Sequence, residues 1–223
     1  MTKEENRKRI ADVGIIPVVR ASSPHQALLA AEAVCAGGIP IVEVTMTVPG
    51  AIEVIRQLAK TAGHDVLVGA GTVLDADTAQ RCLDAGAEFL VSPGFDLQTV
   101  KLAREKGILV IPGALTPTEV ITAWNAGSDL IKIFPCGTVG GAKYIKALKG
   151  PLPQVPMIPT GGVNLDTAAD FILAGAEALG VGGELVSASA LKSGKTNEIT
   201  EAARRFVAIV REARQQSAVR SST

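Results

Sequence analysis

The 223-residue sequence predicts a single (β/α)₈ (TIM) barrel, an α/β fold in which eight parallel strands alternate with helices. Glycine recurs at positions 37, 63, 86, 107, 127, 150 and 175, at intervals of 20 to 26 residues. Most of these glycines end an Ala- and charge-rich stretch and precede a short β-branched run, as expected of a helix followed by a strand. No Pro- or Ser-rich linker divides the chain, so residues 1–223 are expected to form one domain.

The elements follow from this repeat. A charged extra helix over residues 1–12 is expected before the first strand, and a last helix over 196–215 is expected before a disordered tail at 216–223. An open doubly wound sheet is the alternative fold, but its Gly-rich fingerprint is missing after the first strand. The expected strands are 15–19, 39–45, 66–68, 88–91, 108–111, 130–134, 157–159 and 178–181.

Composition excludes several classes of function. The 22 basic and 22 acidic residues balance, so nothing indicates nucleic acid or a membrane surface as a partner. The charged start is not a signal peptide, and no apolar run reaches transmembrane length. Three widely spaced cysteines indicate reduced thiols and a cytoplasmic location. His25 and His64 have no ligand-type neighbours, so no metal and no other cofactor is expected.

Lys132 lies in the middle of an apolar run, residues 130–134. Lysine is rarely buried without a partner or a task, and burial disfavours its charged form. A neutral amine attacks carbonyl groups, which indicates Schiff-base chemistry. The alternative is a lysine at a strand end whose ammonium reaches water.

Glu43 is predicted to share the barrel interior with this lysine. Side chains alternate along a strand, which places Glu43 and Lys132 on inward faces of two even-numbered strands. A carboxylate would then face the amine across the barrel mouth. A purely structural ion pair is the alternative, but desolvation makes such a pair a poor stabiliser.

Glycine-rich turns end the last two expected strands. Thr160-Gly161-Gly162 leads into Asn164, a suitable helix N-cap, and Gly182-Gly183 follows the eighth strand. This is the usual phosphate site of such barrels, and free backbone N–H groups there would bind an anion.

Seven ordered motifs carry a resemblance across essentially the whole barrel. The chain resembles the class I 2-keto-3-deoxy-6-phosphogluconate (KDPG) / 4-hydroxy-2-oxoglutarate aldolases. The resemblance implies that Lys132 forms the Schiff base with pyruvate, that Glu43 is the general acid/base, and that the protein is a homotrimer. The motifs are residues 37–45, 68–73, 89–93, 111–113, 131–135, 147–151 and 159–162.

The resemblance also implies that Thr72 and Thr160 line the substrate site, and we expect substrate binding by Arg20, Thr47, Pro93 and Phe134 as well. Two positions depart from the family pattern. Thr47 stands where many members have a carboxylate-binding arginine. We expect Arg20, on the neighbouring strand, to supply that charge instead. The alternative is that Arg20 only pairs with a carboxylate such as Glu43. Glu184 follows Gly182-Gly183, where many members have a small hydroxyl residue. Phosphate binding is expected from Gly161, Gly162, Gly182 and Gly183.

The predicted function is metal-independent cleavage of a 2-keto-3-deoxy sugar acid. KDPG, the first choice, would give pyruvate and D-glyceraldehyde 3-phosphate, and 4-hydroxy-2-oxoglutarate would give pyruvate and glyoxylate. One alternative is another phosphate-binding barrel synthase or isomerase, which needs no imine-forming lysine. Another is a non-catalytic trimeric barrel module, which would gain nothing from the Lys132–Glu43 pair.

Overall fold

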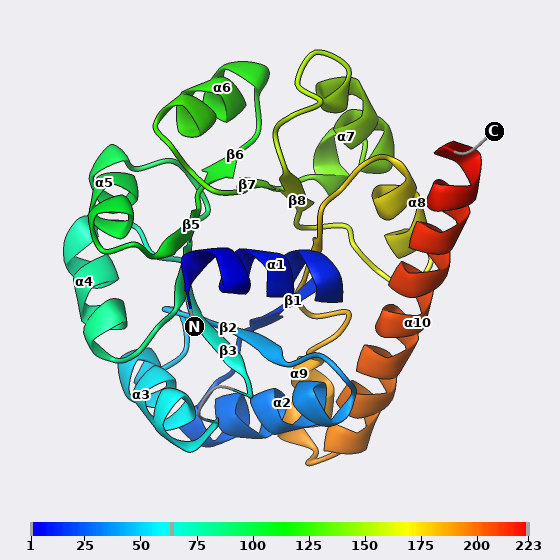
Figure 1. Cartoon of the computed structure of the whole chain (residues 1–223). Coiled ribbons are helices and arrows are strands. Elements are labelled where there is room, and N and C mark those ends of the chain that lie inside the picture. Colours follow the sequence, from blue (N-terminus) through cyan, green and yellow to red (C-terminus); the bar gives the residue numbers. More distant parts are fainter. Residues whose placement is uncertain (1, 63–64, 222–223) are drawn as a thin grey trace.

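The computed structural model describes residues 2–62 and 65–221, which form a mixed α/β fold with helices around parallel strands (Figure 1). The strands are β1 (Ile15–Val19), β2 (Ile41–Thr45), β3 (Leu67–Gly71), β4 (Phe89–Val91), β5 (Leu109–Ile111), β6 (Gly113–Ala114), β7 (Ile131–Ile133), β8 (Met157–Pro159) and β9 (Leu179–Val181). The helices are α1 (Lys3–Val13), α2 (Pro24–Ala36), α3 (Ala51–Ala62), α4 (Ala76–Asp84), α5 (Leu97–Glu105), α6 (Pro117–Asn125), the 3₁₀ turn η1 (Gly137–Val139), α7 (Ala142–Lys149), α8 (Ala168–Leu173), α9 (Ala188–Lys192) and α10 (Thr196–Ser221).

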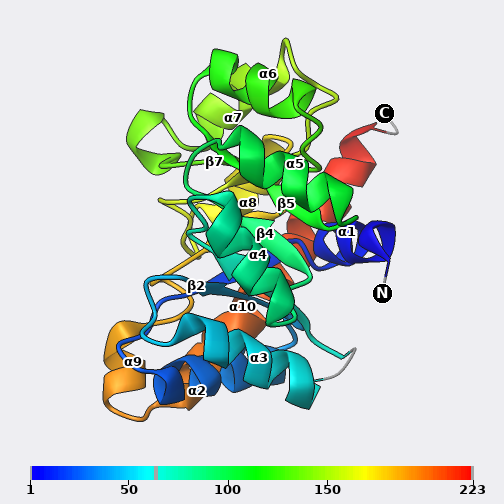
Figure 2. The same cartoon turned by 90° about the vertical axis from the view of Figure 1, so that its left-hand side faces the viewer.

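Hydrogen bonds divide the described strands into two sheets, where one closed sheet was expected. Six strands pair in the order β5-β4-β3-β2-β1-β9, and three pair in the order β6-β7-β8. A bridge between Thr160 and Gly180 links the β8 and β9 sides, and Pro112, which has no N–H to donate, separates β5 from β6. The structure therefore confirms the expected barrel only in part. The parallel strands curl and are surrounded by helices, but they pair as two sheets and not as one closed sheet (Figures 1 and 2).

The core is built from the strands and from the inner faces of the helices. Every residue of the strands is buried, as parallel sheets covered by helices require. Helix α2 lies against the strands through small side chains such as Ala27 and Ala30, which allow close approach. Phe89, Phe171 and Phe206 are among the largest side chains in this core.

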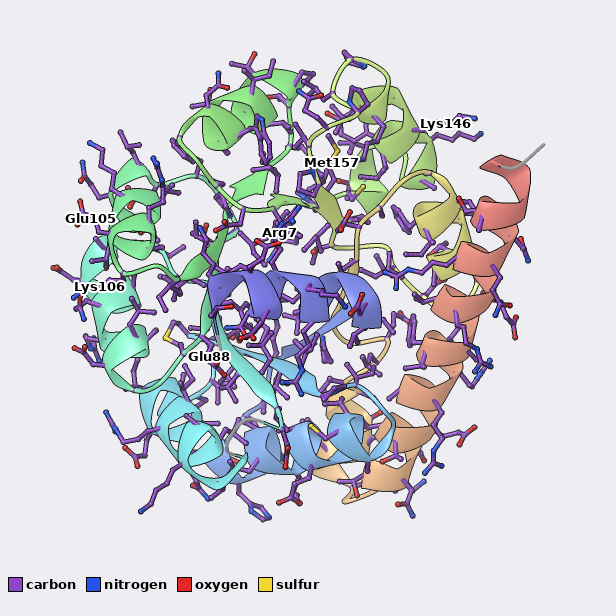
Figure 3. The ribbon with its side chains drawn as sticks, viewed as in Figure 1. Arg7, Glu88, Glu105, Lys106, Lys146 and Met157 are labelled. Carbon is purple, nitrogen blue, oxygen red and sulfur yellow. The ribbon has the colours of Figure 1, made fainter. Side chains whose placement is uncertain are left out.

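Helix α1 lies across the amino ends of the strands (Figures 1 and 2). It starts in a capping box between Thr2 and Glu5. Lys3 on this helix pairs with Asp129, just before β7, at 2.7 Å, and Figure 3 shows Arg7 and Glu88 at this end of the molecule. The carboxyl ends of the strands therefore remain for a site on the opposite side.

The carboxyl-terminal helix is longer than expected. Helix α10 extends from Thr196 to Ser221, so the prediction that the helix ends at 215, with a disordered tail at 216–223, is wrong for residues 216–221. These six residues contain no Gly or Pro that would end a helix. The helix packs against α8 and α2, and residues 222–223 lie outside the described part.

The glycine repeat marks the helix ends, but not always at the expected residue. Gly86, Gly107, Gly127 and Gly175 have positive φ angles between 67° and 99°, as expected of residues that follow a helix. After α2 the left-handed residue is Gly38 at 93°, while Gly37 has φ −83°. Gly150 at the end of α7 also remains in the right-handed region, and Gly63 lies outside the described residues.

Candidate active site

Lys132 lies at the centre of β7, and both neighbouring strands hold its backbone. It is paired with Gly113 of β6 and Ile158 of β8, and its N–H donates to the carbonyl of Pro112 at 2.9 Å. The residue is only 4% exposed. Its Nζ lies 5.1 Å from the centroid of the Phe134 ring, and it has no ion-pair partner within 4.0 Å among the described residues. The amine is thus buried and not neutralised by a contacting carboxylate.

Glu43 occupies the equivalent interior position on β2, between Val18 of β1 and Gly69 of β3. It is 2% exposed, and its Oε1 has no hydrogen-bond partner. Burial raises the pKa of the Glu43 carboxyl, while the positive charges of Lys132 and then Arg20 oppose that rise. Both groups are thus buried, and the charge of Lys132 acts on the Glu43 carboxyl.

The Cys136 thiol, which is the thiol nearest in sequence to Lys132, does not compete with the lysine as a nucleophile. Cys136 follows β7 and is buried, and burial raises the pKa of its thiol to about 11. It therefore stays protonated at neutral pH, and its Sγ lies 3.6 Å from the carbonyl of Gly141. The described residues also contain no group of three His, Cys, Asp or Glu side chains that could hold a metal ion.

A small cavity, here called the glycine pocket, lies where the last strands end. It has a volume of about 160 Å³. Gly161 and Gly162, with φ angles of 85° and 79°, lie beyond the last paired residues of β8. The pocket is lined by Val18, Arg20, Phe134, Thr160, Gly161, Gly162, Val163, Gly180, Gly182, Gly183 and Glu184.

The pocket brings together most residues that the sequence predicted for substrate and phosphate binding. Thr160 is 6% exposed, and its hydroxyl lies over Gly180, where an added Cβ would be 2.1 Å from Oγ1. The Asn164 side chain caps the turn at Asp166 and Thr167, but α8 itself begins only at Ala168. The helix expected directly behind the glycine turn therefore starts later, because residues 165–167 form that turn.

Three other predicted residues do not line this pocket: Thr47, Thr72 and Pro93. Thr47 lines a separate groove of about 740 Å³, which it shares with Arg20, and its hydroxyl lies 2.7 Å from that of Thr45. Pro93 and Phe134 line a third cavity of about 290 Å³. Arg20 and Phe134 each border two of these spaces, so they link the predicted residues into one region at the carboxyl ends of the strands.

Two residues that shape the glycine pocket were not predicted from the sequence, one because it is small and one because it only faces inward. Val18 and Gly180 line the glycine pocket, yet neither was singled out. A signal existed for Val18, because it alternates with Arg20 on one face of β1. The role of Gly180 depends on a neighbour from β8, which no local pattern reveals.

Thr72 follows β3 with φ 57°, the one positive φ of a non-glycine residue in the described chain. A β-branched residue in this region is an outlier, with a cost of about 1–3 kcal/mol. Such strain persists only where the surrounding structure imposes it. Thr72 directly follows Gly71, the end of β3 that adjoins Glu43, so the strained residue lies beside the candidate site.

We expect Thr72→Gly to raise the melting temperature by about 2–4 °C, because relief of the strain exceeds the extra backbone entropy of about 0.5–1 kcal/mol that glycine loses. Loss of the hydroxyl should lower kcat/KM by about 10- to 100-fold. Thermal unfolding and steady-state kinetics measure both effects, with Thr72→Ser as the control that keeps the hydroxyl. A lower melting temperature for Thr72→Gly would contradict the presence of strain.

A buried amine and a buried carboxyl on neighbouring parts of one interior are an arrangement that enzymes forming an imine on a lysine can use. A sequence model described as KDPG and KHG aldolase matches residues 6–202. The chain belongs to the KDPG and KHG aldolase family.

Individual relatives and a solved structure carry the same family name. The KHG/KDPG aldolase of Escherichia coli K12 is 37% identical over 194 residues, which cover 86% of this chain and 90% of the relative. The 2-dehydro-3-deoxy-phosphogluconate aldolase of Treponema pallidum is 36% identical over 89% of this chain and 94% of its own. The crystal structure of KDPG aldolase from Legionella pneumophila, with pyruvate captured as a covalent carbinolamine, has a TM-score of 0.84 and 32% identity, and the match covers 90% of this chain and 97% of that one.

Proposed function

We propose that this protein is a class I aldolase that cleaves a 2-keto-3-deoxy sugar acid through a Schiff base on Lys132. KDPG would give pyruvate and D-glyceraldehyde 3-phosphate, and 4-hydroxy-2-oxoglutarate would give pyruvate and glyoxylate. The observation that carries the proposal is the Lys132 amine, 4% exposed and without a carboxylate in contact, in the same interior as Glu43.

The reaction begins with attack of the Lys132 amine on the C2 keto carbon of the substrate. Proton transfer to the departing oxygen, assisted by Glu43, releases water from the carbinolamine and leaves a protonated imine. The C4 hydroxyl then loses its proton to Glu43, directly or through water, and the C3–C4 bond breaks. Its electron pair moves into the imine to give an enamine, and the aldehyde departs.

The second half of the cycle returns the proton. The enamine takes a proton at C3, which regenerates an imine, now of pyruvate. Water adds to this imine, and release of pyruvate restores the free amine. Glu43 is suited to both directions of transfer, because burial raises the pKa of its carboxyl and so favours a group that can donate a proton as well as accept one.

The surrounding residues would bind the rest of the substrate. We assign the pyruvyl carboxylate to Arg20 with the hydroxyls of Thr47 and Thr72, because Arg20 supplies a guanidinium next to the glycine pocket. Pro93 and Phe134 would pack against the carbon chain, since they line one cavity. The buried hydroxyl of Thr160 would bind a substrate hydroxyl.

We place the distal anion of the substrate in the glycine pocket. Its lining includes Gly161, Gly162, Gly182 and Gly183, whose backbones can approach a phosphate closely. Helix α8 is too short and starts too far along the chain to contribute a dipole, so the binding would rest on these N–H groups. Glu184 lines the same pocket and would oppose a phosphate dianion.

Glu184→Ser should lower KM for KDPG by about three- to tenfold, because removal of one negative charge about 4 Å from the phosphate relieves a repulsion of that order in water. KM for 4-hydroxy-2-oxoglutarate, which carries no phosphate, should change by less than twofold. Initial rates of pyruvate formation with both substrates measure the difference. An equal change for both substrates, or none, would show that Glu184 does not act on the phosphate.

The reaction itself is tested by supplying the purified protein with KDPG, its galactonate epimer and 4-hydroxy-2-oxoglutarate in turn, with a chelator present. We expect pyruvate and the matching aldehyde in equal amounts, without added metal. Failure to cleave any of the three would overturn the proposal.

We further propose a closed (β/α)₈ barrel that acts as a single domain, and a cytoplasmic homotrimer. The bridge between Thr160 and Gly180 supports closure. The three free cysteines support a reducing location, and no described helix has the length and apolar character to cross a membrane.

Light scattering on the purified protein tests the trimer, and we expect a mass about three times the 22.9 kDa of one chain. Four exposed large apolar side chains offer contact surface for it: Leu74, Leu97, Ile121 and Val139.

A further inference from the structure

Gly71, the last residue of β3, leaves a space that the carboxyl of Glu43 fills. It pairs with Thr45 of β2, two residues beyond Glu43. A Cβ added at Gly71 would lie 2.0 Å from Oε1 of Glu43, 2.6 Å from Cδ and 2.7 Å from Cγ. Real Cβ atoms do not approach other atoms this closely, so the Glu43 side chain and an alanine at 71 cannot both occupy their places.

The Gly71 backbone has little room to withdraw, so the Glu43 side chain is the part that must move if a Cβ is added. Glu43 is 2% exposed, so its side chain is enclosed. The carbonyl of Gly71 accepts a hydrogen bond from the N–H of Met46 at 2.8 Å, which ties the end of β3 to the end of β2. Beyond Gly71 the chain turns through Thr72 at φ 57°, a conformation that allows little adjustment.

One oxygen of this carboxyl lies against Gly71 and has no hydrogen bond to another described protein group. Oε1 has no hydrogen-bond partner, yet it is the atom closest to the missing Cβ. A buried oxygen without a polar partner is free to shift wherever the packing permits. The absence of a side chain at position 71 therefore decides where Oε1 lies.

We propose that Gly71 is a positioning residue, which sets the location of the Glu43 carboxyl relative to the Lys132 amine. The inference rests on the proposed function, in which Glu43 transfers protons. An alanine at 71 displaces the carboxyl from its place beside β3, and a displacement of about 1 Å can cost about 10²-fold in rate.

Gly69, on the same strand and face, provides a matched control. A Cβ there would lie 2.3 Å from the ring of Phe89, so Gly69→Ala crowds an apolar ring and not the carboxyl. We expect Gly69→Ala to lower the melting temperature, while kcat per folded molecule stays within about threefold of the parent. Gly71→Ala should instead lower kcat by about 10- to 100-fold with KM changed less than about threefold.

A double-mutant cycle with Glu43→Gln separates positioning from general crowding. If Gly71 acts through Glu43, Gly71→Ala should cost less than about twofold in kcat once Glu43→Gln has removed proton transfer. An equal loss in both backgrounds, or a Gly71→Ala variant within twofold of the parent, overturns the inference. Near-parental kcat for Glu43→Gln alone instead overturns the proposed role of Glu43, so the two failures are distinguishable.

A second variant covers the case in which Gly71→Ala does not fold. Glu43→Asp shortens the side chain by one methylene and withdraws the carboxyl from the Gly71 backbone. The double variant Gly71→Ala/Glu43→Asp should then be folded by circular dichroism, with kcat within about twofold of Glu43→Asp alone. A double variant that remains unfolded shows that other atoms limit the space, and this overturns the inference.

Discussion

Lys132→Met should abolish turnover and pyruvate trapping together. The substitution keeps an apolar stem in β7 and removes the amine, so no imine can form. We expect kcat to fall by about 10⁴-fold or more, the order of loss when a catalytic nucleophile is removed. Borohydride reduction in the presence of pyruvate should add one three-carbon acid to the parent protein, and peptide mass spectrometry should find it on Lys132.

The matched control is Lys146→Met on α7. Lys146 is exposed and points away from the strands (Figure 3). Its loss should leave both turnover and the adduct unchanged. Melting temperatures provide a second check, because removal of a buried amine without a contacting carboxylate should not destabilise the fold. An adduct on Lys146 or Lys143, or trapping that persists in Lys132→Met, would mean that the imine forms elsewhere.

The alternation of helix and strand was predictable because local sequence determines it. Glycines after amphipathic stretches and short β-branched runs located most strands to within two residues, as at β7, expected over 130–134 and found over Ile131–Ile133. The exceptions are β3, which ends at Gly71 and not at 68, and β6, which was not expected. The division into two sheets was not predictable, since it depends on how Pro112 and the bridge at Thr160 meet neighbouring strands. The length of α10 was underestimated because the end of the chain was expected to be poorly ordered.

The positions of Lys132 and Glu43 were predictable, because the alternation of side chains within a single strand determines which face each residue occupies. The alternation of side chains places Lys132 and Glu43 in one interior, and their mutual influence agrees with that. The contact of Glu43 with Gly71 and the positive φ of Thr72 could not be anticipated, because both depend on adjacent strands in three dimensions. The same holds for Arg20, whose position between two cavities follows from the packing of β1 against β2 and β9.

Glu43→Gln should lower kcat by at least about 10²-fold and also raise the melting temperature at neutral pH. The first effect follows from the loss of proton transfer, which should also slow pyruvate trapping. The second follows from burial, which raises the pKa of this carboxyl and makes its ionised form costly in the folded state. An amide of the same shape carries no such cost.

The pH dependence has a definite sign. Below the pKa of the unfolded state, the Glu43 carboxyl is neutral in both states and the parent and the Gln variant should be equally stable. As pH rises above that value, the unfolded state ionises more readily than the folded state, so the parent loses stability until pH passes the raised pKa of the folded state. The stability advantage of Glu43→Gln should therefore grow from about pH 4 upward and then level off, as measured by melting curves at a series of pH values.

Glu53→Gln supplies the control, because Glu53 is on the outer side of α3 with a side chain that is 71% exposed. Its replacement should change neither kcat nor the pH dependence of the melting temperature, because an exposed carboxylate paired with Arg56 contributes little. If Glu43 were only the ion-pair partner of Lys132, Glu43→Gln would leave a buried ammonium without a counter-charge and lower the melting temperature at neutral pH. A gain in stability combined with a loss of turnover instead identifies Glu43 as a group whose buried charge is retained for proton transfer.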